Sequence, residues 1–154
     1  MPRRHTIALA PDEQRRYLEA SHTIILSTLD RHGYPHAVAM WYAVEPDGAV
    51  VMTTFAKSQK AVNVRRDPRC SLLLESGQTY DELKGLLIRG RAELDADVEH
   101  VLDVLGRVHV KYAMPGAGDT LREALRAQAR KRVVIRIRPE RIASWDHRKL
   151  GGAY

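Results

Sequence analysis

Runs of hydrophobic and β-branched residues alternate with short polar segments along the first half of the chain. The runs occupy residues 23–29, 37–44, 50–54 and 70–74. β-Branched residues favour strands, and turn-forming sequences rich in Asp, Gly and Pro separate the first three runs. Because parallel strands need longer connections, this spacing predicts an antiparallel meander.

The second half of the chain carries the pattern of further strands. Charged and apolar residues alternate with period two at residues 86–94. Residues 133–137 alternate in the same way, and Pro139 is expected to end that strand. Residues 142–145 can form a short last strand. The pattern therefore predicts six or seven strands in all.

Helices are predicted between these strands. Pro11 is followed by acidic residues, which is typical of the first turn of a helix, and this helix is expected to end near Ser21. A short segment with a polar start predicts a second helix, which starts near Ser58 and stops at Pro68.

Apolar residues recur at helical spacing from residue 98 to residue 112. A loop is expected at residues 114–118, and a further helix over residues 121–130 is capped by Asp119 or Thr120. Because strands and helices do not alternate strictly, the pattern predicts a small α+β domain whose antiparallel sheet curls into a barrel.

Length and composition narrow the class of protein. The chain has 154 residues, the length of one domain, with 44% hydrophobic and 29% charged residues, which excludes general disorder. Its net charge of +6 favours anionic partners such as a phosphorylated ligand, nucleic acid or an acidic membrane. No signal peptide or membrane span is expected. Cys70 is the only cysteine and can form no intrachain disulfide, so we expect a cytoplasmic protein.

The segment at residues 53–60 is the most informative for chemistry. It leaves a strand, enters a helix and gathers three hydroxyls and two ammonium groups. A helix N-terminus has free N–H groups and a partial positive charge, which suit a phosphate. Thr54, Ser58 and Lys60 can add hydroxyl donors and a full charge to the same anion. The alternative is a capped surface helix with solvated lysines, and the local sequence favours neither.

A second candidate feature lies on the run at residues 37–44. Ala37, Ala39, Trp41 and Ala43 share one face by period-two spacing. The small side chains leave room for a flat ring, beside which Trp41 can stack. In the alternative interpretation, the alanines allow close packing of the sheet in the core.

Other kinds of site have little support. Among the seven histidines only His32 and His36 are four residues apart, and they fall in and beside a turn-forming segment with no cysteine near them, so no metal site is expected. No G-x-S-x-G, Walker or G-x-G-x-x-G sequence occurs, and Ser-His-Asp hydrolysis has no support. Nucleic-acid binding rests on charge alone, without a nucleic-acid motif. It would use a basic stripe of four residues, Arg89, Arg91, Arg136 and Arg138.

Several stretches carry a resemblance to a known superfamily. Residues 54–68, TFAKSQKAVNVRRDP, resemble the phosphate-binding segment of pyridoxamine 5'-phosphate oxidases and their flavin-reductase relatives. The other matching stretches are Pro35-His36 with Met40-Trp41-Tyr42, residues 80–93, and residues 144–150, SWDHRKL. From about residue 21 to residue 150 they follow the order typical of the flavin/deazaflavin oxidoreductases of group B.

The resemblance implies a fold and an assembly. The fold is α+β, a six- to seven-stranded antiparallel split β-barrel with flanking helices, in a single domain over residues 1–154. Its expected parts are an N-terminal helix at 11–21, barrel strands at 22–94, a helical insertion at 96–130, and last strands with the C-terminal tail at 132–150. It further implies a homodimer with the cofactor in the groove between two barrels, and neither nucleic acid nor membrane as a partner.

The resemblance also implies a cofactor. In group B this is the deazaflavin coenzyme F420, which has a flavin-like ring, a phosphodiester and an acidic oligoglutamate tail. Pyridoxamine oxidases carry an Arg and a Lys on the second strand that help to hold the FMN phosphate, whereas residues 37–42 contain no basic residue. This difference favours F420 over the alternative, FMN. The implied cofactor contacts are Thr53, Thr54, Lys57, Ser58, Gln59, Lys60, Trp41 and Arg65. The basic residues among them, together with Arg66, suit the acidic tail.

The expected function is that of an F420-dependent oxidoreductase, which transfers a hydride between the cofactor and a small organic substrate. The catalytic residue stays unassigned, and Tyr80 and His147 are candidates for donating a proton or orienting the substrate. Two alternatives remain open. One is an FMN-binding protein like pyridoxamine 5'-phosphate oxidase, and the other is a non-catalytic carrier of flavin, deazaflavin or haem.

Overall fold

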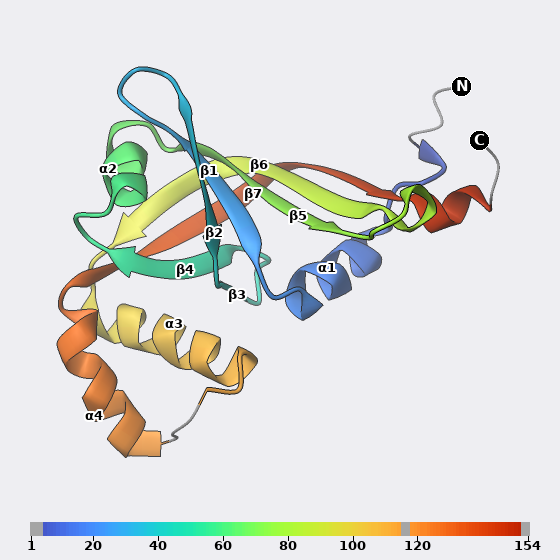
Figure 1. Cartoon of the computed structure of the whole chain (residues 1–154). Coiled ribbons are helices and arrows are strands. Elements are labelled where there is room, and N and C mark those ends of the chain that lie inside the picture. Colours follow the sequence, from blue (N-terminus) through green and yellow to red (C-terminus); the bar gives the residue numbers. More distant parts are fainter. Residues whose placement is uncertain (1–4, 115–117, 152–154) are drawn as a thin grey trace.

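Seven antiparallel strands form one curled sheet in the computed structural model of the chain, which describes residues 5–114 and 118–151 (Figure 1). The strands are β1 Ile24–Leu29, β2 Pro35–Met40, β3 Ala43–Val44, β4 Val50–Phe55, β5 Arg69–Ser76, β6 Lys84–Asp95 and β7 Arg132–Asp146. Their order across the sheet is β2-β1-β5-β6-β7-β4-β3. This is the α+β split-barrel architecture that the sequence predicts.

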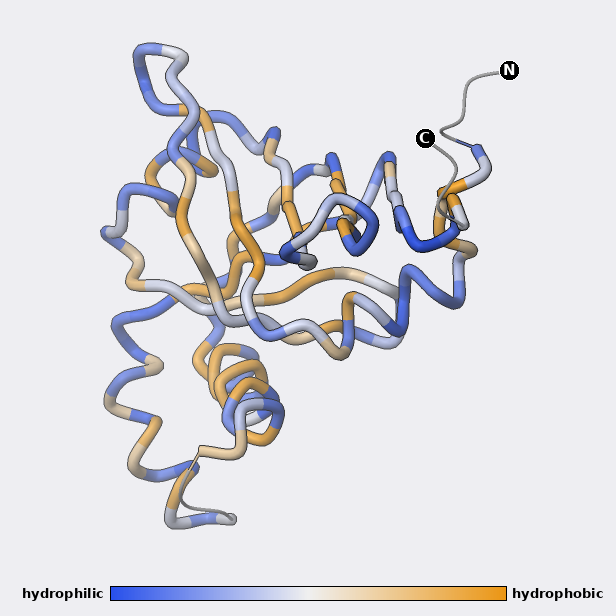
Figure 2. The backbone as a smooth tube through the Cα atoms, turned by 45° about the vertical axis from the view of Figure 1, so that its right-hand side comes forward, coloured by the Kyte–Doolittle hydropathy of each residue, from blue (hydrophilic) through white to orange (hydrophobic). Residues whose placement is uncertain are grey.

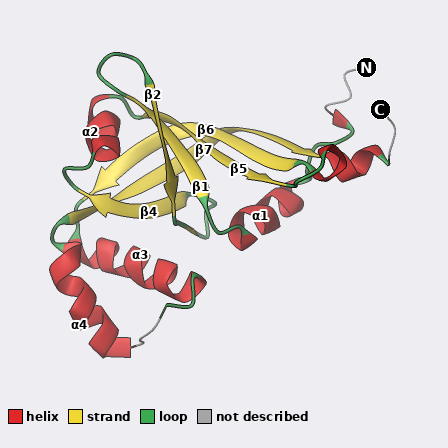
Figure 3. Ribbon diagram, in the orientation of Figure 1, coloured by secondary structure: helices red, strands yellow, loops and turns green. Residues whose placement is uncertain are grey.

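Helices flank the sheet on two sides (Figure 3). They are α1 Pro11–Ala20, α2 Gln59–Arg66, α3 Val98–Lys111 and α4 Gly118–Ala129, with short 3-10 helices η2 Tyr80–Glu82 and η3 His147–Leu150. The predicted starts of α1 and α2 are confirmed. The caps predicted for α4 are wrong, because that helix begins at Gly118 and Asp119 and Thr120 lie in its first turn. Residues 115–117 of the predicted loop lie outside the described residues.

The hydrophobic run at residues 37–44 is not one strand, contrary to the prediction. β2 pairs with β1 at one edge of the sheet, and β3 pairs with β4 at the opposite edge. The chain leaves the ladder at Trp41 because Tyr42 is buried in the core. The Tyr42 hydroxyl donates toward the carbonyl oxygens of Leu18 and Ser21, at 2.5 and 3.0 Å. The predicted meander of three adjacent strands is therefore wrong. The same residues form two separate hairpins, β1–β2 and β3–β4, at opposite edges of the sheet.

The last strand passes through Pro139, where the sequence predicted an end. The two strands expected near the C-terminus are one continuous strand, because the ladder between β6 and β7 shifts its register here and leaves Glu140 as an extra residue. Such a bulge accommodates a residue that has no N–H to donate. Gly90 lies opposite Pro139, and a Cβ on Gly90 would come within 2.2 Å of the carbonyl oxygen of Arg138. The close approach of the two backbones requires glycine.

The curled sheet encloses the main core on its inner face. The core is built from alternate strand residues, with Leu18 of α1 and Val64 of α2 packed against them. A second core lies on the outer face of β3, β4 and the start of β7, where it includes Val51, Val104 and Val134. Figure 1 shows α3 and α4 covering this part of the sheet, and Figure 2 shows the hydrophobic stretches of α3. The outer face of β2, β1, β5 and β6 carries no helix among the described residues.

No helix in residues 5–114 and 118–151 combines the length and the apolar character that a membrane crossing needs.

Candidate functional site

The junction between β4 and α2 forms as the sequence predicts. β4 ends at Phe55 and α2 begins at Gln59. Ser58 is the N-cap residue, and its Oγ accepts a hydrogen bond from the Ala61 N–H at 3.4 Å. A hydroxyl in this position satisfies one of the free N–H groups of the first turn. The cap fixes where the helix starts, and with it the position of the neighbouring polar groups.

Three of the predicted phosphate ligands lie together at this junction. Thr54 Oγ1 donates to Ser58 Oγ at 3.0 Å and accepts from Lys60 Nζ at 3.2 Å. Thr54 is buried, and Ser58 and Lys60 are half-buried. Two hydroxyls and an ammonium group are therefore held in one hydrogen-bonded set.

Arg132 joins this set from the start of β7, and sequence reasoning missed it. β4 and β7 pair with Phe55 opposite Arg132. The guanidinium lies over the Phe55 ring at 4.4 Å, and its Nη1 is 3.5 Å from Thr53 Oγ1. The Arg132 Nε is buried and has no hydrogen-bond partner among the described residues. Thr54, Ser58, Lys60 and Arg132 are called the cationic cluster below.

The electrostatics of the cationic cluster favour an anion. The pKa of Lys60 lies below its ordinary value, because burial and then the charge of Arg132 disfavour its ammonium form. Neither cation has a carboxylate within ion-pair distance in the part of the chain that the structure describes. Two cations that converge without a counter-charge are suited to a phosphate or phosphodiester. The unpartnered Nε of Arg132 is a further donor for such a group.

The other residues predicted around the phosphate have different surroundings. Lys57 is exposed. Gln59 Nε2 donates to Asn63 Oδ1 at 2.7 Å, and Arg65 Nη2 donates to the carbonyl oxygen of Ala56 at 3.4 Å. Gln59 and Arg65 therefore engage α2 and the β4–α2 junction, next to the cationic cluster.

Asn63 holds α2 on the sheet. It is fully buried, and its Nδ2 donates to Thr28 Oγ1 of β1 at 3.0 Å while its Oδ1 accepts from Gln59. The only hint in the sequence was a polar residue between Ala61 and Val64, on the apolar side of the helix. Asn63 thus ties α2 to β1.

Trp41 is half exposed at the end of β2. Its indole stacks on the ring of Tyr112, with centroids 4.4 Å apart and planes 10° apart. The predicted common face of the alanines is interrupted here, because Ala39 is exposed on β2 and Ala43 is buried on β3. The interpretation as close core packing therefore holds for Ala43 only. The ring beside Trp41 is that of Tyr112, at the end of α3.

The two candidates for proton donation lie side by side. The rings of Tyr80 and His147 are 4.6 Å apart, and His147 Nδ1 is 2.7 Å from the carbonyl oxygen of Tyr80. They belong to η2 and η3, at the end of the β5–β6–β7 ribbon far from α2 (Figure 1). Within one chain they do not reach the cationic cluster.

With this geometry established, the comparisons with known proteins identify the family. The family model of pyridoxamine 5'-phosphate oxidase matches residues 10–146. The chain belongs to the pyridoxamine 5'-phosphate oxidase family. It is similar to the F420H(2)-dependent biliverdin reductase of Mycobacterium tuberculosis, with 27% identity over 139 residues, which are 90% of each chain.

Two solved structures resemble this chain in fold. A conserved hypothetical protein from Mycobacterium tuberculosis is 42% identical, with a TM-score of 0.91 over 100% of this chain and 95% of its own. A structure named F420 reductase is 22% identical, with a TM-score of 0.68 over 86% of this chain and 98% of its own. The second likeness concerns the fold alone.

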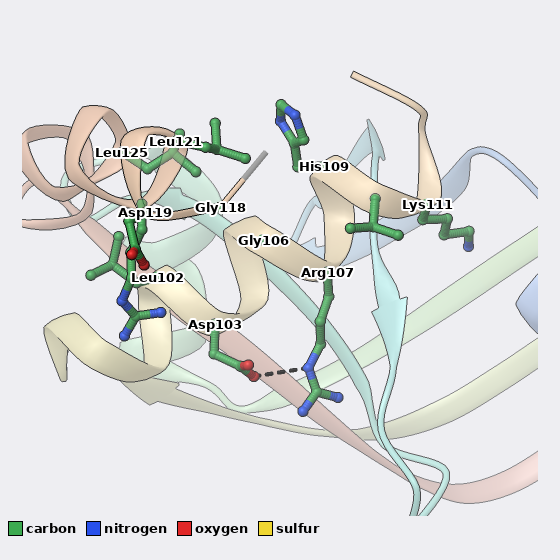
Figure 4. A pocket seen from close by; sticks show the side chains of 12 residues that line it. Leu102, Asp103, Gly106, Arg107, His109, Lys111, Gly118, Asp119, Leu121 and Leu125 are labelled. Atoms are coloured by element: carbon green, nitrogen blue, oxygen red, sulfur yellow. Dashed lines mark ion pairs between the residues drawn. The ribbon is translucent and has the colours of Figure 1, made fainter. Parts of the chain in front are cut away.

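This family member also has a pocket of about 630 Å³ between α3 and α4 (Figure 4). Leucines from both helices line it, together with Asp103 and Arg107, which form an ion pair at 2.8 Å. None of the cationic cluster borders this pocket. Within residues 5–114 and 118–151 no group of three His, Cys, Asp or Glu side chains is placed to hold a metal ion. The candidate site is the cationic cluster, because its hydroxyl, ammonium and guanidinium groups are suited to an anion.

The basic stripe suggested by the sequence is partly neutralised. Arg136 Nε pairs with Glu45 Oε2 at 2.7 Å, and its Nη2 pairs with Asp47. Arg138 pairs with Glu93 at 3.5 Å. Arginines that are already paired with carboxylates are less able to neutralise the phosphates of a nucleic acid. This arrangement disfavours nucleic-acid binding.

Proposed function

We propose that this chain is an F420-dependent oxidoreductase, which transfers a hydride between the deazaflavin and a small organic substrate. The cationic cluster carries the proposal, because it offers hydroxyl, ammonium and guanidinium donors to a phosphodiester and contains no carboxylate. The relative from Mycobacterium tuberculosis is named for F420H(2)-dependent reduction of biliverdin. Its name makes F420 the first cofactor to test and a linear tetrapyrrole the first substrate.

Each residue has a physical role in this proposal. The ammonium of Lys60 and the guanidinium of Arg132 neutralise the phosphodiester, and the hydroxyls of Thr54 and Ser58 turn to donate to it. Trp41 flanks the ring. The deazaflavin supplies the hydride, so the protein needs to orient two ligands and to exclude water rather than to provide a nucleophile.

We also propose that the site is completed in a homodimer. Directly paired residues on the open outer face of the sheet form an apolar row across five strands: Ala39, Ile25, Leu73, Leu87 and Ala143. Three of them are half-buried and two are exposed. An apolar row of this kind suits a self-complementary two-fold contact. A second chain seated there would bring Tyr80 and His147 to its partner's cationic cluster, where they would orient the substrate or donate a proton.

Fluorescence titration of the purified protein with F420 and, separately, with FMN tests the proposed function. We expect micromolar binding of F420, weaker binding of FMN, and a loss of at least about tenfold in F420 affinity in Lys60→Ala. Lys57→Ala is the matched control, since Lys57 is exposed, and a change below about threefold is expected. Binding of neither cofactor contradicts the proposal.

Turnover separates the enzyme from a carrier. Biliverdin, quinones and unsaturated ketones are mixed with reduced F420 and the protein, and cofactor oxidation is followed by absorbance. We expect oxidation with at least one acceptor.

A carrier is the alternative that this experiment would detect. The fold is shared with HutZ, a heme storage protein from Vibrio cholerae, at 18% identity and a TM-score of 0.65. Tight binding of cofactor or haem without any turnover would therefore identify a carrier.

A further inference from the structure

Trp41 is half exposed, yet its orientation is fixed. The stack on Tyr112 covers one face of the indole, with centroids 4.4 Å and planes 10° apart. Parallel aromatic contacts of this kind restrict both rings. If one face of an exposed indole is covered, only its other face can accept a flat ligand.

Tyr112 is held in turn by groups from three segments. Its hydroxyl donates to the carbonyl oxygen of His22, just before β1, and accepts from the Tyr42 N–H at 3.3 Å. The His22 ring meets it edge-on at 5.3 Å. Tyr112 is also the C-cap residue of α3, where its own N–H bonds back to the helix. These contacts leave the Tyr112 ring little freedom to rotate.

Lys111 adds a positive charge behind the stack. Its Nζ lies 3.6 Å from the centroid of the Tyr42 ring and 5.5 Å from that of Tyr112. This Nζ is buried and has no hydrogen-bond partner among the described residues. Contact with two aromatic faces therefore replaces hydrogen bonds for this ammonium group. The Tyr112 ring, which stacks on Trp41, thus has a packed cationic side chain beside it.

The aromatic stack is a feature separate from the cationic cluster. Met40, next to Trp41, pairs with Ile24 at the start of β1. Asn63 of α2 bonds to Thr28, near the other end of the same strand. The stack is therefore a surface for a flat ring that does not depend on contact with the cationic cluster.

We propose that Trp41 backed by Tyr112 is a platform for a planar conjugated ring, and that Tyr112 is its positioning residue. This inference rests on the proposed function only where it names the molecule that carries the ring. That molecule is either the cofactor or the substrate, and a planar conjugated ring would be recognised in the same way in both. Stacking on the open indole face holds the ring parallel to the Tyr112 plane.

The test uses Trp145→Phe, which leaves Trp41 as the only tryptophan of the chain. Riboflavin is the probe, because it has a planar ring and no phosphate, and quenching of Trp41 emission measures its affinity. Tyr112→Leu removes the stack and is expected to weaken riboflavin binding about tenfold and to lower the fluorescence anisotropy of Trp41. Tyr112→Phe keeps the ring but loses the hydroxyl contacts, and a loss of about threefold is expected.

Two controls separate positioning from a general effect on folding. Affinity for inorganic phosphate, measured by calorimetry, is expected to change less than about twofold in both Tyr112 variants, because the cationic cluster is intact. Val110→Ala alters a residue that is 80% exposed on the same helix end, and should leave riboflavin binding unchanged. If Tyr112→Leu does not fold, Tyr112→Phe decides the test.

Competition with F420 identifies the source of the ring. Displacement of riboflavin by F420 assigns the platform to the cofactor, and continued riboflavin binding beside saturating F420 assigns it to the substrate. The absence of quenching in the parent protein, or equal affinities in Tyr112→Leu and the parent, overturns the proposal. A failure of F420 turnover leaves these riboflavin results untouched, so the two proposals fail separately.

Discussion

Lys60 and Arg132 reach the same end of β4 from two different elements, α2 and β7, and carry like charges without a carboxylate between them. Lys60 hydrogen-bonds Thr54, and Arg132 lies against Phe55 and Thr53. The pKa of Lys60 is lowered by burial first and by Arg132 second. The free protein therefore keeps a repulsive pair that a bound anion would relieve.

Arg132→Gln is expected to lower affinity for phosphate-bearing ligands about tenfold to a hundredfold, because a charged and buried donor is lost. The same change should bring the pKa of Lys60 closer to its ordinary value, since one of its two causes disappears. Titration with F420 or FMN measures the first effect. Arg138→Gln is the control, as Arg138 lies on the same strand and pairs with Glu93. Equal losses in the two variants would contradict a specific role for Arg132.

Asn63→Ala is expected to destabilise the fold by about 2 kcal/mol, because the Thr28 hydroxyl and the Gln59 amide lose their buried partner. The loss should also loosen α2 and so weaken binding at the cationic cluster. Denaturant unfolding and ligand titration on the same sample measure both. Val62→Ala, on the exposed side of the same helix, should change stability by less than about 0.5 kcal/mol.

Lys111→Met is expected to alter how stability depends on pH. Burial lowers the pKa of Lys111 to about 8, and its ordinary value is 10.5. Between these values the unfolded chain binds more protons than the native chain, so the native protein gains stability as pH rises. Below pH 8 the native lysine is charged, and burial of this charge lowers the stability of the native protein. Lys111→Met should therefore be more stable at pH 7, by about 1 kcal/mol after allowance for solvent screening of the exposed part of the side chain.

The advantage of Lys111→Met should shrink as pH rises to about 10, where the native lysine is neutral. Urea unfolding at several pH values measures it. A variant less stable than the parent at pH 7 would show that the contact of the ammonium with Tyr42 outweighs the cost of its burial.

Leu73→Arg is expected to convert a dimer to a monomer, because it places a charge in the middle of the apolar row on the open face. Sedimentation at micromolar concentration measures the change. Val110→Arg puts the same charge on an exposed position of α3 and should leave the assembly unchanged. A parent protein that is monomeric at high concentration would refute the proposed homodimer.

The parts of the site that the sequence could predict are those set by neighbouring residues. Ser58 and the start of α2 follow from local capping preferences, and Thr54 and Lys60 lie within four residues of that cap in the sequence. Arg132 could not be found in this way, because only the pairing of β4 with β7 brings it to Phe55. An alternating pattern shows that a strand exists, but does not say which strand lies beside it.

The errors in the fold have a similar origin. The run at residues 37–44 looks like one strand, and its break depends on carbonyl groups of α1 and the following loop that accept from Tyr42. The passage of β7 through Pro139 depends on a glycine in the facing strand. In both cases the partner is distant in sequence, so local propensity gave the wrong boundary.

Strand β7 begins at Arg132 and ends at Asp146, next to His147. Its 15 residues span roughly 50 Å if extended at about 3.3 Å per residue. One paired strand thus separates the cationic cluster from the Tyr80–His147 pair, and no loop closure within a chain can join them. In the proposed homodimer, occupancy of the completed site would therefore depend on protein concentration, and dilution below the dimer dissociation constant would release substrate.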